Sequence, residues 1–162
     1  MNENLKKKFF AYLLFIVGAC ITGLAAAFLI RDSVGIYQDV KTPFFAPPGF
    51  LFPVVWTVLY ILMGISAAKV WLGREKNKNE ADKGLLLYAG SLTANFIWCI
   101  VFFNFRIYLA AFVLLTVLLL LIIKTVLSYR KISPAAAYLQ IPYMLWVSFA
   151  GILNFSIWLL NG

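Results

Sequence analysis

Long uncharged stretches alternate with short charged segments along the whole chain. A helix that rises 1.5 Å per residue needs about 20 apolar residues to cross a hydrocarbon layer of about 30 Å. Five stretches meet this requirement, so we predict an all-α integral membrane protein, a five-transmembrane-helix bundle formed by one domain (1–162). The predicted helices cover approximately 9–30, 52–72, 84–105, 107–128 and 133–160.

Proline and polar residues set several of the predicted helix ends. Pro53 is tolerated in the first turn of the second helix, since the first turn has no intrahelical acceptor for its backbone nitrogen. Lys124 can extend its ammonium group to the membrane surface, which lengthens the short fourth span. Ser133 can cap the fifth helix, with Pro134 at its first position. Pro142 lies inside that helix and predicts a kink beside a cavity.

The first span has some features of a secretory signal peptide, because Lys6, Lys7 and Lys8 precede an apolar run that ends near Ala25 to Ala27. Its apolar run is longer than a signal peptide needs, and no polar cleavage region follows. We therefore expect a retained transmembrane helix.

Positive charge is distributed unevenly over the connections between the predicted helices. Eleven of the 14 Lys and Arg residues lie in the N-terminal segment and in the second and fourth connections, and three lie elsewhere, namely Arg31, Lys41 and Arg106. The positive-inside rule then predicts the N-terminus inside, and the C-terminus and first loop outside. We expect the membrane to be the cytoplasmic membrane of a bacterium. The net charge of +8 mainly reflects topology, and such scattered charges do not form a nucleic-acid-binding face.

Composition removes most catalytic chemistry from consideration. Hydrophobic residues make up 64% and charged residues 12% of the chain, which excludes a soluble enzyme. There is no histidine, and all six acidic residues lie outside the predicted spans, so we expect no acid-base site, metal site, cofactor, ion pump or ion channel. Cys20 and Cys99 lie in apolar runs and are interpreted as packing residues. Binding is thus favoured over catalysis.

Three tryptophans stand near polar side chains within the predicted spans, namely Trp56, Trp98 and Trp146. Asn95 and Trp98 are three residues apart and share a helix face. Asn95 and Asn154 need polar partners in hydrocarbon, so each either bonds to another helix or lines a pocket; the sequence leaves both open. A cavity of indole rings and amides would suit a flat hydrophobic ligand with a polar edge.

The first outer connection, residues 31–51, is much longer than the others, and loops of this length are usually functional or disordered. Its second half, Pro43-Phe-Phe-Ala-Pro-Pro-Gly-Phe, is stiff and aromatic, which argues against disorder. We predict that this loop forms a lid over the outer mouth of the bundle.

Three sequence segments resemble the translocator protein family, also known as tryptophan-rich sensory proteins or peripheral benzodiazepine receptors. The resemblance covers nearly the whole chain, with five spans in the same order. The matching segments are Tyr37-x-x-Val-x-x-Pro43-x-Phe45-x-Pro47-Pro48-x-x-x-Phe52-Pro53-x-x-Trp56-x-x-Leu59-Tyr60-x-x-Met63-Gly64, Asn95-x-x-Trp98 with Phe102-Phe103, and Pro142-Tyr143-x-x-Trp146-x-x-Phe149-Ala150-x-x-Leu153-Asn154-x-x-x-Trp158.

The resemblance implies a five-helix bundle, often homodimeric, with a pocket under the first loop that binds porphyrins and other hydrophobic ligands. Porphyrin would be a ligand rather than a resident cofactor, and membrane lipid would surround the bundle. The residues that the resemblance assigns to the pocket are Tyr37, Phe45, Pro47, Pro48, Trp56, Asn95, Trp98, Trp146, Ala150 and Leu153.

The chain departs from the family pattern at three places. Phe45 stands where relatives commonly have tryptophan, and Ser91 stands where they have glutamine, which shortens a polar contact in the third helix. The sterol motif of the fifth helix requires a terminal Lys or Arg, but this chain continues as Trp158-Leu159-Leu160-Asn161. Dedicated sterol binding is therefore not expected.

Small residues recur at four-residue spacing on two predicted helices. Gly90 and Ala94 on the third helix could bring two copies of the chain together, and Ala19, Gly23 and Ala27 form a similar ridge on the first. Such ridges also pack helices within one chain. We predict a homodimer whose interface includes Gly90 and Ala94.

The leading hypothesis is a receptor or sensor that holds a porphyrin in the pocket. A second hypothesis, implied by the resemblance for some members, is degradation of the porphyrin in the presence of light and oxygen, with Trp56 and Trp146 as redox partners. A third is transport of hydrophobic molecules through lid opening and lateral gaps between helices.

Overall fold

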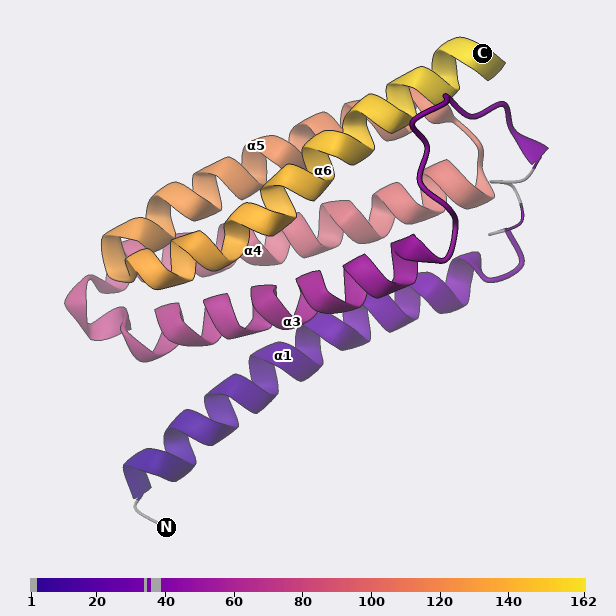
Figure 1. The fold of residues 1–162 in the computed structure, drawn as a ribbon. Helices are drawn as coiled ribbons and strands as arrows, with labels where there is room; N and C mark the ends of the chain where they lie inside the picture. The colour runs from indigo at the N-terminus through magenta and orange to yellow at the C-terminus, as the bar shows by residue number, and fades with distance from the viewer. Residues whose placement is uncertain (1–2, 34, 36–38) are drawn as a thin grey trace.

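A computed structural model describes residues 3–33, 35 and 39–162, and this part of the chain contains helices and no strand. Tyr37, one of the predicted pocket residues, lies outside the described residues. Five helices are long and apolar enough to cross a membrane, which confirms the predicted fold class. They are α1 (Glu3–Ile30), α3 (Leu51–Leu72), α4 (Lys78–Cys99), which continues into η2 (Ile100–Asn104), α5 (Tyr108–Ile132) and α6 (Pro134–Asn161), with η1 (Arg74–Lys76) before α4 (Figure 1).

The helices form a ring that is closed more loosely at one side. α1 packs on α3, α3 on α6, α6 on α5, and α5 on α4, whereas α4 and η2 meet α1 through fewer contacts. The two ends of the chain lie at opposite ends of the bundle (Figure 1). We call the end with the start of α1, the α3–α4 connection and the α5–α6 turn the basic end, and the end with residues 39–50 the loop end.

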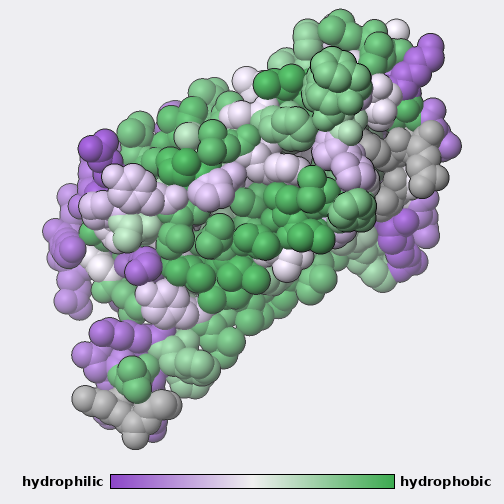
Figure 2. All heavy atoms as spheres, viewed as in Figure 1, coloured by the Kyte–Doolittle hydropathy of each residue, from purple (hydrophilic) through white to green (hydrophobic). Residues whose placement is uncertain are grey.

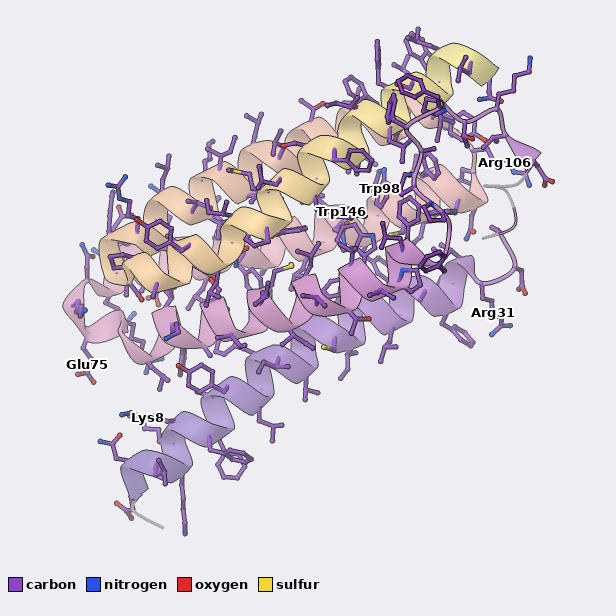
Figure 3. The ribbon with its side chains drawn as sticks, in the orientation of Figure 1. Lys8, Arg31, Glu75, Trp98, Arg106 and Trp146 are labelled. Carbon is purple, nitrogen blue, oxygen red and sulfur yellow. The ribbon has the colours of Figure 1, made fainter. Side chains whose placement is uncertain are left out.

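Charged side chains gather at these two ends. Figure 2 shows a hydrophobic belt over the middle of the visible face and hydrophilic residues at its two ends. Lys8 and Glu75 lie at the basic end, and Arg31 and Arg106 lie at the loop end (Figure 3). This distribution matches a bundle whose middle is in contact with lipid chains.

Several helices extend beyond the predicted ranges. α1 begins at Glu3 rather than near residue 9, α4 begins at Lys78 rather than near 84, and α5 continues to Ile132. A helix can continue past the hydrocarbon layer, so the positions of charges underestimate its length. Asn77 caps α4 by accepting a hydrogen bond of 3.1 Å from the backbone N–H of Glu80.

Two predicted helix starts are confirmed. The Ser133 hydroxyl caps α6 by accepting a hydrogen bond of 3.3 Å from the Ala136 N–H, with Pro134 as the first helical residue. Pro53 lies in the first turn of α3. Pro142 lies within α6, as predicted, and is not among the residues that line the pocket described below.

Glycines allow α1 and α3 to approach closely. A Cβ atom on Gly64 of α3 would lie within 3 Å of the backbone of Ile16, and a Cβ atom on Gly23 of α1 would overlap the ring of Tyr60. At Gly23, the small-residue ridge of α1 therefore packs against α3 of the same chain.

Candidate ligand-binding pocket

A pocket of about 550 Å³ lies at the loop end between α1, α3, α4, η2 and α6. Pockets of this size usually take small organic molecules. Its α1 side is formed by small residues and its other sides are mainly aromatic. The lining residues are Gly23, Ala26, Ala27, Ile30, Gly49, Phe50, Phe52, Pro53, Trp56, Tyr60, Trp98, Cys99, Phe102, Phe103, Ala150, Leu153 and Asn154.

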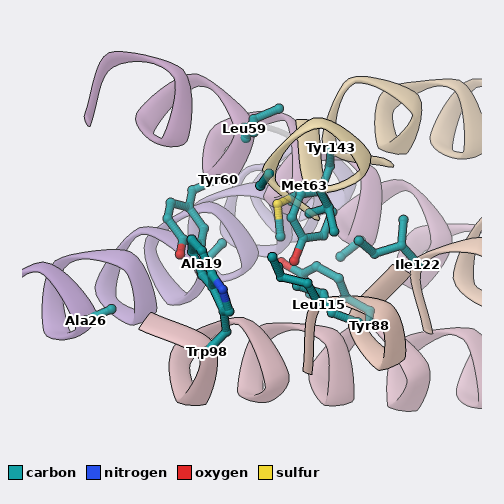
Figure 4. Packing of buried hydrophobic residues seen from close by; sticks show 14 of the residues in the cluster. Ala19, Ala26, Leu59, Tyr60, Met63, Tyr88, Trp98, Leu115, Ile122 and Tyr143 are labelled. Atoms are coloured by element: carbon teal, nitrogen blue, oxygen red, sulfur yellow. The ribbon is translucent and has the colours of Figure 1, made fainter. Parts of the chain in front are cut away.

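Two tryptophans form the centre of the aromatic wall. The ring centroids of Trp56 and Trp98 are 6.2 Å apart with an interplanar angle of 38°. Trp56 also packs on Tyr60 at 5.7 Å, and Trp98 packs on Phe102 at 5.8 Å. Figure 4 shows Tyr60 extending from α3 and Trp98 from α4 into the space between these helices. The wall therefore offers aromatic faces from several helices to one ligand.

Asn154 fixes the orientation of Trp98. The indole N–H of Trp98 donates a hydrogen bond of 3.1 Å to Asn154 Oδ1, and Asn154 Nδ2 donates one of 2.8 Å to the backbone carbonyl of Tyr108. These bonds join α4, α6 and the start of α5. Asn154 lines the pocket as well, so it fulfils both roles that the sequence left open.

Asn95 lies behind the pocket wall. It is fully buried, and its Nδ2 donates a hydrogen bond of 2.8 Å to the Tyr60 hydroxyl. Its Oδ1 atom has no hydrogen-bond partner among the described residues. Asn95 thus bonds between helices and positions Tyr60, while Tyr60 itself faces the pocket.

A π-helical turn at the end of α4 brings two phenylalanines into the wall. In η2 the Phe105 N–H bonds to the Ile100 carbonyl at 3.2 Å, the five-residue spacing of a π-helix. Such turns often occur at functional sites. Both Phe102 and Phe103 line the pocket. Arg106 follows with φ of 58°, a left-handed conformation that lets the chain turn sharply into α5.

The end of the loop borders the pocket, and the loop is fastened to the C-terminal helix. The Lys41 N–H donates to Asn161 Oδ1, and Asn161 Nδ2 donates to the Lys41 carbonyl, both at 2.9 Å. Gly49 and Phe50, at the end of the loop, line the pocket. Pro47 and Pro48 precede them without lining it, so they shape the loop, with a turn from Pro48 to Leu51 closed by a 3.0 Å bond.

Trp146 belongs to a second aromatic group, which we call the lid cluster: Phe45, Phe52, Trp146 and Phe149. Trp146 packs on Phe52 at 5.9 Å and on Phe149 at 5.5 Å, and Phe149 packs on Phe45 at 6.3 Å. Phe45 and Trp146 do not line the pocket, whereas Phe52 does, so the two aromatic groups meet at Phe52. Trp146 and Trp98 are labelled in Figure 3.

The structure thus brings part of the predicted set together. Trp56, Trp98, Ala150 and Leu153 line the pocket, and the other described candidates lie behind its wall, in the loop or in the lid cluster. Sequence reasoning left Tyr60, Phe102, Phe103 and the α1 ridge out of the candidate set. Two features of the sequence could have indicated them. Phe102 lies seven residues after Asn95 on the same helix face, and Gly23 belongs to the small-residue ridge of the first helix.

Fold and pocket together define a class of protein: a five-helix membrane protein with an aromatic pocket bordered by the end of a long first loop. A sequence profile of the TspO/MBR family matches residues 10–159. The chain belongs to the TspO/MBR family, and the resemblance drawn from its motifs is confirmed.

Similar proteins occur in bacteria and animals. The tryptophan-rich protein TspO of Chlorobaculum tepidum is 40% identical over 147 residues, which cover 90% of this chain and 92% of the relative. Protein CrtK of Rhodobacter capsulatus is 36% identical over 148 residues, 91% of this chain and 89% of that protein. The translocator protein of Ovis aries is 34% identical over 122 residues, which cover 75% of this chain and 72% of that protein. This chain is accordingly a membrane receptor, sensor or translocator of that family.

Proposed function

We propose that this protein is a membrane receptor or sensor that binds a porphyrin, or a similar flat hydrophobic molecule, in the pocket under the loop. The observation that carries the proposal is the 550 Å³ pocket walled by Trp56, Trp98 and Phe102. Aromatic faces attract a planar π-system, and a mainly apolar, concave pocket buries most of such a ligand. With no histidine in the chain, stacking, shape and amide contacts hold the ligand without a histidine–metal bond.

Filling the pocket tests this proposal directly. Ala150 lines the pocket and is 4% exposed, so Ala150→Phe places a ring where the ligand would lie. Ile152 is two residues away on the same helix and 61% exposed, which makes Ile152→Phe a matched control. The affinity of the purified protein for protoporphyrin IX is measured from the absorbance of the porphyrin itself.

We expect Ala150→Phe to weaken binding at least tenfold and Ile152→Phe to change it less than twofold. Equal affinity in both variants would show that the porphyrin binds elsewhere, for example on the lipid-facing surface. Using the porphyrin signal avoids the ambiguity of tryptophan quenching, in which a substituted tryptophan removes the reporter together with the contact.

Transport is a second candidate because the pocket has a weakly held wall. α1 supplies Gly23, Ala26 and Ala27 to the pocket, yet only 11% of its most apolar segment is buried, against 28–39% for the other four spans. Movement of α1 would open the pocket sideways to the membrane. A flux assay of protoporphyrin in proteoliposomes tests this, and a rate equal to that of empty liposomes argues against transport.

Light-dependent degradation of the porphyrin remains a prediction. This hypothesis gives redox roles to Trp56 and Trp146, and of these two residues only Trp56 lines the pocket. A wild-type protein that bleaches bound porphyrin no faster than detergent does would reject degradation. If bleaching occurs, Trp56→Phe should slow it more than Trp146→Phe.

We also propose that the basic end faces the cytoplasm of a bacterial cell and the loop end faces outward. The support is the excess of Lys and Arg in the N-terminal segment and the connections at the basic end. Alkaline phosphatase fused after Gly162 should be active and green fluorescent protein fused there should be dark. The opposite pair of results would reverse the orientation.

A homodimer through α4, with Gly90 and Ala94 in its interface, is the remaining proposal about assembly. A Cβ atom placed on Gly90 would lie 3.9 Å from Leu121 Cδ1 of α5, so Gly90 is at the edge of the face available to a second copy. Ala89 and Thr93 are exposed on the neighbouring face. Disulfide cross-linking of Ala89→Cys in membranes should give a dimer, and a monomer under oxidising conditions would argue against this interface.

A further inference from the structure

A second cavity, of about 800 Å³, lies at the basic end between α4 and α5. It is separate from the aromatic pocket, and no residue lines both. On α4 its lining residues are Glu80, Lys83 and Leu87, which share one helix face because they are three and four residues apart. We call this cavity the basic groove.

The α5 side of the basic groove has the same regular spacing. Four lining residues of α5 are spaced by three, one and three residues and therefore share the face that is turned toward α4. They are Lys124, Leu127, Ser128 and Lys131. Arg130 lines the groove as well. The groove therefore combines a row of polar side chains with two leucines, one from each helix.

Positive charge in the basic groove is only partly balanced. Glu80 accepts a hydrogen bond of 3.2 Å from Ser128 and forms an ion pair of 3.1 Å with Lys131. The lining contains four cations and this one carboxylate. Within residues 3–33, 35 and 39–162, no ion pair is formed by Lys83, Lys124 or Arg130. Among these residues, the groove thus carries three positive charges without a counter-ion.

The position of Lys124 on α5 favours a bound anion. It lies eight residues before the end of α5 at Ile132, about 12 Å along the helix axis. Lys124 follows the apolar run 107–123 of α5, where a cation is costly unless its ammonium group reaches water or an anion. Leu87 and Leu127 line the same groove and offer apolar contact. An anion with an attached hydrocarbon chain would satisfy both parts of the groove.

We propose that the basic groove binds one anionic phospholipid from the leaflet at the basic end. Its phosphate is held by Lys83, Lys124 and Arg130, and an acyl chain lies along Leu87 and Leu127. The net positive charge of the lining and its two leucines together match an anionic phospholipid, which carries a phosphate group and acyl chains.

Native mass spectrometry of the full chain in mild detergent tests the proposal. The probes are phosphatidylglycerol, phosphatidylcholine with identical acyl chains, and glycerol phosphate, which has no acyl chain. The test variant is Lys83→Gln with Lys124→Gln. The control, Lys7→Gln with Lys8→Gln, removes the same charge from α1 at the same end of the bundle (Figure 3). Circular dichroism establishes that all variants retain their helices.

We expect the wild type to bind one phosphatidylglycerol roughly tenfold more tightly than phosphatidylcholine, since each cation near the headgroup contributes to binding. The test variant should lose this preference, and the control should keep it. Glycerol phosphate should bind much more weakly than phosphatidylglycerol. Porphyrin affinity should be unchanged in the test variant, which separates this site from the aromatic pocket.

Four results would overturn the proposal. The first is equal affinity of the wild type for the two phospholipids, and the second is an equal loss in test and control variants, which would indicate general surface charge. The third is binding of glycerol phosphate as tight as that of phosphatidylglycerol, which would indicate a site for a free anion. The fourth is a wild-type dimer that binds no phosphatidylglycerol and that the test variant no longer forms, which would identify a second copy of the chain as the occupant of the groove.

Discussion

Single side chains in this protein act mostly by orienting aromatic rings. Asn154 accepts from Trp98 and donates to Tyr108, while Asn95 donates to Tyr60, so each amide fixes one ring of the pocket wall. Hydrogen bonds between membrane helices contribute about 0.6–2 kcal/mol each. Their larger effect here is geometric, because a fixed ring is already arranged for stacking before a ligand arrives.

The clearest prediction at the residue scale concerns Gly23. A side chain at this position would overlap the Tyr60 ring, which lines the pocket. We expect Gly23→Val to displace Tyr60 and weaken protoporphyrin binding about tenfold. Gly18 lies on the same helix with open space around its Cβ position, so Gly18→Val is the control. Equal affinities in titrations of the two variants would contradict the placement of Tyr60.

Segments of the chain contribute features that single residues do not reveal. The π-helical turn η2 carries Phe102 and Phe103 into the wall, and the loop is tied to the end of α6 by the paired bonds between Lys41 and Asn161. Both segments border the pocket at the loop end. We therefore expect their positions to influence access of a ligand from that side.

Removing the hydrogen bonds between Lys41 in the loop and Asn161 in α6 should speed dissociation of the ligand. Asn161→Ala removes both hydrogen bonds to Lys41, so we expect faster hydrogen exchange at the Lys41 amide and porphyrin dissociation several-fold faster than in the wild type. Leu160→Ala, at an exposed neighbouring position, should leave both rates unchanged. Unaltered dissociation in Asn161→Ala would show that the loop does not gate the pocket.

Much of this arrangement was predictable from the sequence, because charges are excluded from hydrocarbon and mark the ends of membrane spans. The capping by Ser133 and the start of α3 near Pro53 followed from backbone chemistry. The start of α1, the start of α4 and the end of α5 could not be predicted in this way, since these helices continue beyond the membrane. The separation of Trp146 from Trp56 also could not be predicted, because which side of α6 faces the pocket depends on how α3 and α6 cross.

At the scale of the whole molecule, the ring of helices is most loosely held at α1. This helix depends on its crossing with α3, where Gly64 allows contact with the backbone of Ile16. The other four helices form a more deeply buried unit. Because α1 forms one side of the pocket, the complete pocket depends on the α1–α3 crossing.

Gly64→Ala should push α1 and α3 apart, although alanine has a higher helix propensity than glycine. The added methyl group would meet backbone rather than a movable side chain, so we expect a lower Tm in detergent and weaker porphyrin binding. Gly151 lies in α6 with open space around it, and Gly151→Ala should be neutral or slightly stabilising. A Tm for Gly64→Ala at or above that of the wild type would contradict a tight crossing.

Binding of a porphyrin in the aromatic pocket is tested most directly by an experimental structure of the protein with protoporphyrin IX. We predict flat density between α1 and α6 beneath Gly49 and Phe50, against Trp56 and Trp98 and close to Ala150. Density for the porphyrin on the outer surface of the bundle, with the pocket left free at saturating ligand, would contradict this placement.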